Sequence, residues 1–238
     1  LQLLEKRIVR YSHELLNFDH FAIFLTDQRT NKLQLVMQSG LPPEIQDLDL
    51  YLVNEQANRF FRNEGDGSFA DITAAPLADA SSGRSAGFFD YDNDGDVDLY
   101  LVNATGANRL FRNERGSFSE RAMAAGIADA GNGRGLAVGD YDGDGDADLY
   151  VVNQSGQLRS QLYRNDTVGS DGLFTGVSAE LELRATDSEV AAVFGDYDND
   201  GDPDLFVSDQ SAANALWRND GMLFNRVVGE DPLALGGG

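Results

Sequence analysis

The sequence predicts an all-β fold, a β-propeller of about four antiparallel blades with four strands each, in which the N-terminal segment completes the first blade. Two repeated stretches lead to this fold class. An acidic stretch that reads DYDNDGDVDLYLVN from Asp90 recurs from Asp140 and from Asp196. A second stretch of the type NRLFRN, seen from Asn108, follows each acidic copy. Both are rich in β-prone residues and are bounded by Gly, Asn and Asp clusters, which is typical of consecutive hairpins.

The spacing of the repeats sets the size of the predicted blade. The ninth-position aspartates of the acidic stretches, together with their upstream counterpart Asp49, are separated by 49, 50 and 56 residues. A unit of this length cannot bury its apolar face alone and must stack on its neighbours. The predicted repeats span about residues 48–85, 86–135, 136–191 and 192–238, and a segment of different character, residues 1–47, precedes them.

Within one repeat, the expected strands follow in order. In the second repeat they are AGFFDYD from Ala86, DLYLVN from Asp98, RLFRN from Arg109 and SFSERA from Ser117. Residues 124–134, which contain several Ala and Gly, are the expected crossover to the next blade. A β-sandwich is the alternative for such short strands, but near-identical repeats favour radial stacking.

The turn between the first two strands of each complete repeat has the composition of a metal-binding loop. It reads D-x-D-x-D-G-D-x-D, so positions 1, 3, 5 and 9 offer carboxylates and the glycine at position 6 allows a sharp turn. Hard oxygen donors around one point suit Ca²⁺ better than Mg²⁺, which requires a strict octahedron. The sequence therefore predicts three calcium sites. Their candidate ligands are Asp90, Asp92, Asp94, Asp96 and Asp98; Asp140, Asp142, Asp144, Asp146 and Asp148; and Asp196, Asp198, Asp200, Asp202 and Asp204.

These loops differ from an EF-hand at the end of the motif. An EF-hand has a bidentate Glu at position 12, whereas position 12 here is Leu101, Val151 or Val207. We therefore expect the aspartate at position 9 to close the site, and the aspartate at position 7 to act through its charge or from outside the ligand set. A solvated acidic turn is the alternative for one copy, but three copies in the same register favour metal binding.

With these stretches the chain resembles the FG-GAP or VCBS-type repeats of integrin-like β-propellers, and in particular the bacterial repeats found beside ASPIC/UnbV domains. The resemblance rests on loops such as GDYDGDGDADLYVVN and strands such as LFRN, which recur in order over about residues 48–228. It implies one blade per repeat, calcium on the hairpin between the first two strands with the aspartates above as its ligands, and a role in adhesion, recognition or scaffolding.

The chain departs from the pattern of this family in two respects. Propellers of the family have about seven blades, whereas this chain has three complete repeats and one that lacks its own first strand. The first repeat also lacks a metal loop, because positions 1, 3 and 5 are Leu41, Pro43 and Ile45, and only Asp47 and Asp49 remain. We expect that blade to be free of calcium.

Residues 1–47 read as a helix followed by a hairpin. The hairpin is expected to turn at residues 28–31, and the whole segment resembles the opening third of a GAF sensor domain. Without the rest of such a domain a ligand pocket cannot be enclosed, so a structural role is favoured. We expect Lys32–Ser39 to supply the missing first strand of the first blade; association of two chains through open ends is the alternative. The apolar stripe that predicts the helix is Leu1, Leu4, Ile8, Tyr11 and Leu15.

Composition excludes several classes of partner. The 40 acidic and 18 basic residues give a net charge of −22, which argues against nucleic acid or anionic membrane surfaces as partners and favours cations. The chain has no Cys, so disulfides and thiolate metal sites are excluded, and it has no apolar run long enough for a membrane span. Since it begins at Leu1 rather than Met, we expect a piece of a longer protein.

No residue pattern predicts catalysis, and we expect no enzyme. The histidines, His13 and His20, lie away from every acidic cluster, and the dense carboxylates are better used by metal than by glycoside hydrolysis.

Two further sets of residues recur at the same position in each repeat. The arginines are expected to buttress contacts between blades, with an acidic partner as the alternative, and the aromatics to fill blade cores rather than to form a sugar platform. These sets are Arg62, Arg112, Arg164 and Arg218, and Phe61, Phe111, Tyr163 and Trp217.

The sequence thus predicts a calcium-binding propeller module that recognises an unidentified protein or glycan. The alternatives are a carbohydrate-binding, lectin-like propeller and a non-catalytic fragment of a larger polysaccharide-active enzyme or sensor. Calcium modules of modest affinity are typical of the extracellular space, so we expect an extracellular or cell-surface location. A cytoplasmic location is the alternative if the GAF-like segment is native to the propeller.

Overall fold

The computed structural model describes residues 21–27, 32–39, 50–52, 58–64, 68–78, 81–154, 158–166, 172–183 and 185–227. These residues contain strands β1 to β17 and no helix, and accordingly none that could cross a membrane. The predicted N-terminal helix, both histidines and the metal-free loop of the first repeat lie outside the described residues. The chain divides into two compact units, Leu1–Leu52 with Asn58–Asp79, and Val53–Ala57 with Ala80–Gly238.

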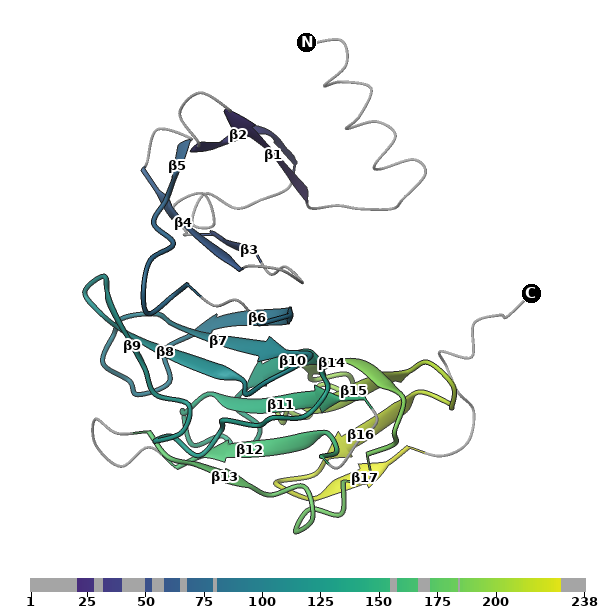
Figure 1. Ribbon diagram of the computed structural model, residues 1–238. Helices are drawn as coiled ribbons and strands as arrows, with labels where there is room; N and C mark the ends of the chain where they lie inside the picture. Colours follow the sequence, from purple (N-terminus) through teal and green to yellow (C-terminus); the bar gives the residue numbers. More distant parts are fainter. Residues whose placement is uncertain are drawn as a thin grey trace. The chain divides into compact units, whose positions relative to one another are not determined.

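The first unit combines the N-terminal hairpin with the first repeat in one five-stranded sheet. The expected hairpin is confirmed, since the first two strands pair antiparallel. The order across the sheet is β1-β2-β5-β4-β3 (Figure 1). The bounds are β1 (Phe21–Asp27), β2 (Lys32–Ser39), β3 (Leu50–Leu52), β4 (Arg59–Asn63) and β5 (Ser68–Asp71).

The position of the hairpin in this sheet differs from the prediction. In a complete repeat the first strand pairs with the second, so Lys32–Ser39 was expected beside β3. Instead β2 pairs with β5, the last strand of the repeat, through Leu33 opposite Phe69 and Gln34 opposite Ser68. The expectation that this segment takes the place of the first strand is therefore wrong: it extends the opposite edge of the sheet. The physical reason is that either edge strand can accept a new partner, and alternation along a strand does not select the edge.

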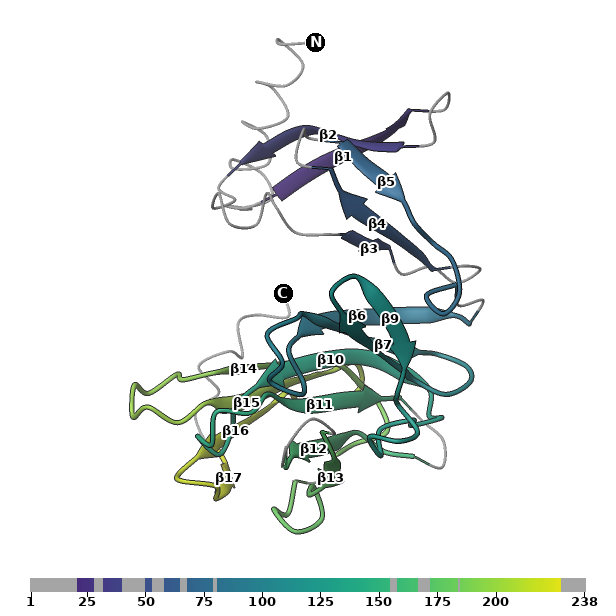
Figure 2. The ribbon, with the colours of Figure 1, turned by 90° about the vertical axis from the view of Figure 1, so that its left-hand side faces the viewer.

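The second unit contains three four-stranded antiparallel sheets, each made of consecutive strands paired in chain order, as predicted for propeller blades. Figures 1 and 2 show the three sheets, with β10 lying next to both β6 and β14. The bounds are β6 (Gly83–Phe89), β7 (Asp98–Asn103), β8 (Arg109–Glu114) and β9 (Ser117–Glu120); β10 (Gly133–Gly139), β11 (Asp148–Asn153), β12 (Gln161–Asn165) and β13 (Phe174–Gly176); and β14 (Glu189–Gly195), β15 (Asp204–Asp209), β16 (Ala215–Asn219) and β17 (Phe224–Arg226).

The middle sheet is covered on both faces, and its second strand shows why the repeats must stack. Every residue of β11, DLYVVN, is buried. Leu149 and Val151 point into the core shared with the sheet β6–β9, whereas Tyr150 and Val152 point into the core shared with the sheet β14–β17. Successive side chains of a strand point to opposite faces, so one apolar run serves two interfaces between sheets.

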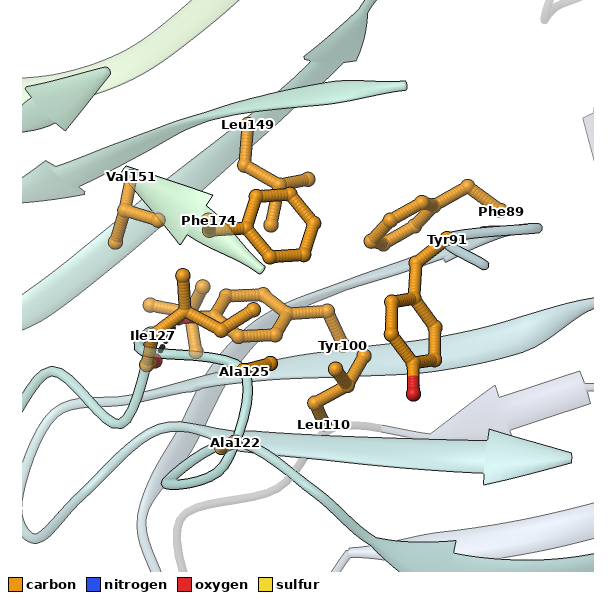
Figure 3. Packing of buried hydrophobic residues seen from close by; sticks show 11 residues of the cluster. Phe89, Tyr91, Tyr100, Leu110, Ala122, Ala125, Ile127, Leu149, Val151 and Phe174 are labelled. Atoms are coloured by element: carbon orange, nitrogen blue, oxygen red, sulfur yellow. Dashed lines mark hydrogen bonds between the residues drawn. The ribbon is translucent and has the colours of Figure 1, made fainter. Parts of the chain in front are cut away.

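The core between the first two sheets of this unit is drawn in Figure 3. Tyr100 is fully buried, and its hydroxyl donates a hydrogen bond of 2.8 Å to the carbonyl of Ile127. Tyr91 and Phe174 stack with their ring centroids 6.4 Å apart. The connection from β9 to β10 contributes Ala122, Ala125 and Ile127 to the same core, and the last two lie in the region predicted as the crossover between blades.

The recurring aromatic residues occupy the cores, as expected. Phe61, Phe111 and Trp217 are 2%, 1% and 9% exposed, and Tyr163 packs against the core of Figure 3. Three of the four rings are therefore buried, and the fourth, Tyr163, is partly buried.

Candidate metal-binding loops

Each of the three acidic loops connects the first strand of its sheet to the second. The loops are residues 90–98, 140–148 and 196–204. Two positions in each loop adopt a left-handed backbone. Position 6 is Gly in all three loops, with φ of 90°, 94° and 99°, values that side chains disfavour. Position 4 is Asn93, Gly143 or Asn199, with φ of 57°, 74° and 61°. Asn and Gly are the residues that tolerate this conformation best, so the local sequence specifies the turn.

The carboxylates at positions 1 and 5 hold the turn together. Oδ2 of Asp90 accepts a hydrogen bond of 2.9 Å from the amide of Gly95, and Oδ1 of Asp94 accepts one of 2.9 Å from the amide of Asp96. The other two loops repeat both bonds at 2.8–3.1 Å. The loop backbone therefore turns its amides towards its own carboxylates and brings several oxygens around one point.

The aspartate at position 9 anchors each loop to its own sheet. Asp98 is fully buried, and its two oxygens accept hydrogen bonds from the amides of Tyr91, at 3.0 Å, and Asn113, at 2.7 Å. Asp148 and Asp204 make the same pair of bonds at 2.8–2.9 Å. This carboxylate therefore has a structural role, since it links the loop to the end of the third strand. This role is independent of whether the carboxylate binds a cation.

The aspartate at position 7 contacts the turn between the third and fourth strands in two repeats. Oδ2 of Asp96 accepts a hydrogen bond of 2.9 Å from the amide of Arg115, and Oδ2 of Asp202 accepts one of 2.9 Å from the amide of Gly221. Asp146 instead accepts a hydrogen bond of 2.6 Å from the side chain of Asn93 in the preceding loop. Whether this aspartate acts from outside the ligand set stays a prediction.

The aspartate at position 3 is the least satisfied carboxylate. Asp92 is 4% exposed. Its Oδ2 lies 2.6 Å from Nε of Arg112 in an ion pair, so a positive charge already lies beside it, whereas its Oδ1 is buried without a hydrogen-bond partner among the described residues. Oδ1 of Asp142 is likewise buried without a hydrogen-bond partner in this part of the chain. Buried oxygens without a donor are costly unless a cation meets them.

A residue that the sequence analysis did not single out connects the loops to each other. Asn165, at the end of the third strand of its repeat, donates from Nδ2 to the carbonyl of Tyr91 in the preceding loop, at 2.8 Å. Asn219 does the same to the carbonyl of Tyr141, at 2.7 Å. Both asparagines are fully buried. The sequence could have indicated the importance of this asparagine, because the dipeptide Arg-Asn occurs in every repeat.

The carboxylates of each loop come together in groups of three whose oxygens lie within 4.8 Å of one another. In the loop of residues 90–98 the group comes from positions 1, 3 and 5, and in the other two loops from positions 1, 3 and 9. The structure thus brings together nine of the fifteen predicted ligands in these groups. They are Asp90, Asp92 and Asp94; Asp140, Asp142 and Asp148; and Asp196, Asp198 and Asp204.

A family model for FG-GAP-like repeats matches residues 46–101, 90–151 and 142–207, which together make up more than half of the chain. The chain belongs to the FG-GAP-like repeat family. No curated protein matches it. FG-GAP-like repeats suggest β-propeller modules for adhesion or recognition, are typically non-catalytic, and are typical of extracellular or surface proteins. The matched residues include only the last two positions of residues 1–47, and the resemblance of this segment to a GAF domain stays a prediction.

The electrostatics of the FG-GAP-like loops favour a bound cation. Burial raises the pKa of Asp98 and of Asp148 to about 7. Burial also raises the pKa of Asp92 and of Asp142. The nearby guanidinium groups of Arg112 and Arg164 oppose this effect, and the neighbouring carboxylates add to it. A cation at the same point would favour the ionised form of these carboxylates.

The recurring arginines of the FG-GAP-like repeats pair within their own repeat. Each one forms an ion pair with the acidic residue two positions further along, so these ion pairs do not make the contacts between blades that were expected. Arg112 also reaches Oδ2 of Asp94, at 3.2 Å, beside its ion pair with Asp92. The pairs are Arg62 with Glu64 at 2.9 Å, Arg112 with Glu114 at 3.0 Å, Arg164 with Asp166 at 2.8 Å and Arg218 with Asp220 at 2.7 Å.

Proposed function

We propose that this chain is a calcium-stabilised, non-catalytic recognition module in which each of the three acidic loops binds one Ca²⁺. The observation that supports this best is a buried oxygen at position 3, Oδ1 of Asp92 and of Asp142, which meets no hydrogen-bond donor among the described residues. These side chains lie in groups of three carboxylates whose oxygens are close enough to share one ion.

The donor set favours calcium over other metals. The three groups offer only carboxylate oxygens, and the loop backbone can add carbonyl oxygens, which is the hard and flexible environment that Ca²⁺ prefers. Zinc and copper sites use thiolate or imidazole ligands, and the chain has no Cys. The nine grouped aspartates would hold the ions, and the aspartates at position 5 of the second and third loops would complete their ligand sets.

The proposed role of the ion is structural. Bound Ca²⁺ supplies positive charge at a point where several carboxylates converge, and so it favours the folded loop. The loop in turn is linked through Asp98 or its equivalents to the end of the third strand, and through Asn165 or Asn219 to the next sheet. The module would then present a stable surface to a protein or glycan partner outside the cell, where calcium is plentiful.

Thermal unfolding with and without calcium tests this proposal. Saturation at about 100 times the dissociation constant stabilises a single-site protein by about 2.7 kcal/mol, and the melting temperature should rise accordingly. Titration calorimetry should give three ions per chain. Mg²⁺ at the same concentration is the control, and it should stabilise less. Melting curves in EDTA that coincide with those in calcium would contradict the proposal.

A further inference from the structure

The first acidic loop, residues 90–98, has a positive charge of the chain beside its carboxylates. Nε of Arg112 lies 2.6 Å from Oδ2 of Asp92, and Nη2 lies 3.2 Å from Oδ2 of Asp94. The side chain of Arg112 is 13% exposed, so solvent and salt screen these ion pairs only in part. Two of the three carboxylates grouped in this loop are therefore already paired with a cation.

The corresponding arginines of the next two repeats do not pair with their loops. The side chains of Arg164 and Arg218 are 33% and 43% exposed, and in the part of the chain that the structure describes neither forms an ion pair with a carboxylate of its own acidic loop. Arg164 acts on Asp142 only from a longer distance. The grouping of the carboxylates differs as well, since the position-9 aspartate belongs to the group in the second and third loops but not in the first.

The difference lies in which edge of the guanidinium group faces the loop. In Arg164 the edge formed by Nε and Nη2 holds Asp166, at 2.8 and 3.2 Å, and the last repeat has the same arrangement. In Arg112 this edge faces the acidic loop, and Nη1 contacts Glu114 at 3.0 Å. The donors of a guanidinium group have a fixed planar geometry, so an edge that holds one carboxylate is not free for another.

The residue two positions after the arginine accounts for this difference. It is Asp in the repeats of the second and third loops, and Glu114 in the repeat of the first loop. A Glu side chain has one more rotatable bond and loses more conformational freedom when it is fixed, so it holds the arginine less firmly. Arg62 shows that a Glu suffices where the loop carries no carboxylate at positions 1, 3 and 5, because its Nε and Nη2 both contact Glu64, at 3.2 and 2.9 Å.

We propose that Arg112 competes with Ca²⁺ for the first acidic loop, so that this loop binds the ion less tightly than the other two. The inference rests on the calcium function proposed above and adds a difference between its sites. An ion at the first loop must separate Arg112 from Asp92 and Asp94, or share their oxygens with a like charge, and both cost free energy. The dissociation constant of this loop should be roughly tenfold higher, which corresponds to about 1.4 kcal/mol.

The weaker site would lie at the junction between two sheets. The backbone carbonyl of Tyr91, in the first acidic loop, accepts the hydrogen bond of 2.8 Å from Asn165 of the sheet β10–β13. As calcium falls, the first loop should lose its ion before the other two. The junction between the sheets β6–β9 and β10–β13 would then respond to calcium before the junction between the sheets β10–β13 and β14–β17.

A calcium titration followed by heteronuclear NMR measures each loop separately. The amides of Gly95, Gly145 and Gly201 each donate a hydrogen bond to the position-1 carboxylate of their own loop, so each amide reports on one site. In the wild type the signal of Gly95 should change at roughly tenfold higher calcium than the other two signals.

Exchange of the two acidic residue types tests the cause. Glu114→Asp should draw the guanidinium group out of the first loop and bring the response of Gly95 into the calcium range of the other two. The reciprocal change, Asp166→Glu, should move the response of Gly145 to higher calcium. Both acidic side chains are at the surface, so the fold should be kept. Gly201 lies in an unaltered loop and is the internal control in both variants.

Arg112→Gln removes the competing charge and should lower the calcium concentration at which Gly95 responds. Three amides that respond at the same calcium concentration in the wild type would overturn this inference and leave the calcium function standing. So would a Gly95 response that Arg112→Gln leaves unchanged. If calcium changes none of the three amides, the calcium function fails, and this inference fails with it.

Discussion

The side-chain amide of Asn165 donates a hydrogen bond of 2.8 Å to the backbone carbonyl of Tyr91, although 74 residues separate the two in the chain. The backbone amide of the same asparagine donates to Asp148 of its own acidic loop. Asn219 repeats this arrangement with Tyr141 and Asp204. The three acidic loops therefore form one continuous hydrogen-bonded series that runs from sheet to sheet.

The asparagine link should contribute measurably to stability. Asn165→Ala removes the donor and leaves the carbonyl of Tyr91 without this partner in a buried place, so we expect a loss of about 1–3 kcal/mol. Urea unfolding without calcium measures it. The control is Asn225→Ala, because Asn225 is exposed and its hydrogen bond to Asp220 is on the surface. Equal midpoints for Asn165→Ala and the control would show that the link carries no stability.

The aspartate at position 9 should be essential even without metal. Asp98→Asn keeps the shape of the side chain but replaces one acceptor with a donor, which then faces the amide of Tyr91 or of Asn113. In EDTA we expect a loss of about 1–3 kcal/mol in the free energy of unfolding. Asp187→Asn is the matched control, since Asp187 is exposed and forms a 3.5 Å ion pair with Arg159 at the surface. If Asp98→Asn destabilises the protein only when calcium is present, its role is that of a ligand alone.

Removal of one position-3 carboxylate should remove one calcium site. Asp142→Asn lowers the charge of the second acidic loop and takes away a buried oxygen that has no hydrogen-bond partner among the described residues. We expect titration calorimetry to change from three ions per chain to two, and the protein in EDTA to lose little stability. Asp187→Asn should still bind three. An unchanged stoichiometry in Asp142→Asn would exclude this carboxylate from the site.

Asp209 should stabilise the last sheet in a way that depends on pH. Burial raises the pKa of this carboxyl, but hydrogen bonds from the hydroxyls of Ser188 and Thr186 and the amides of Ser211 and Ala212 outweigh that effect and lower the pKa to about 2. A lowered pKa stabilises the fold above the ordinary value of 3.8, and the contribution is lost as the pH falls through about 2.

The variant Asp209→Asn measures this contribution. It should be less stable than the wild type by roughly 1 kcal/mol at neutral pH, since Asp209 is partly exposed and solvent weakens its interactions. Urea unfolding of both proteins should show the difference shrinking between about pH 4 and pH 2. A difference that stays constant down to pH 2 would mean that the charge of Asp209 is not its source.

Several features of this protein follow from local sequence alone. The repeat length, the order of strands within each sheet and the acidic turns were all predicted, because they depend on residues that are close in the chain. Gly at position 6 with positive φ, and alternation along strands such as β11, are local requirements of the backbone. The candidate metal residues could be predicted for the same reason, since one short loop supplies each group of carboxylates.

The partners of these elements were decided only by the tertiary structure. The sequence predicted β2 as a strand but not its pairing with β5, because both edges of a sheet offer the same backbone donors and acceptors. Asn165 was visible as a repeated residue, yet its bond to Tyr91 exists only because the two sheets stack. The same stacking buries Tyr141, whereas its counterpart Tyr197 is 48% exposed, although the sequences around them are nearly identical. Local sequence specifies each blade, whereas the burial of its two faces depends on which neighbours are present.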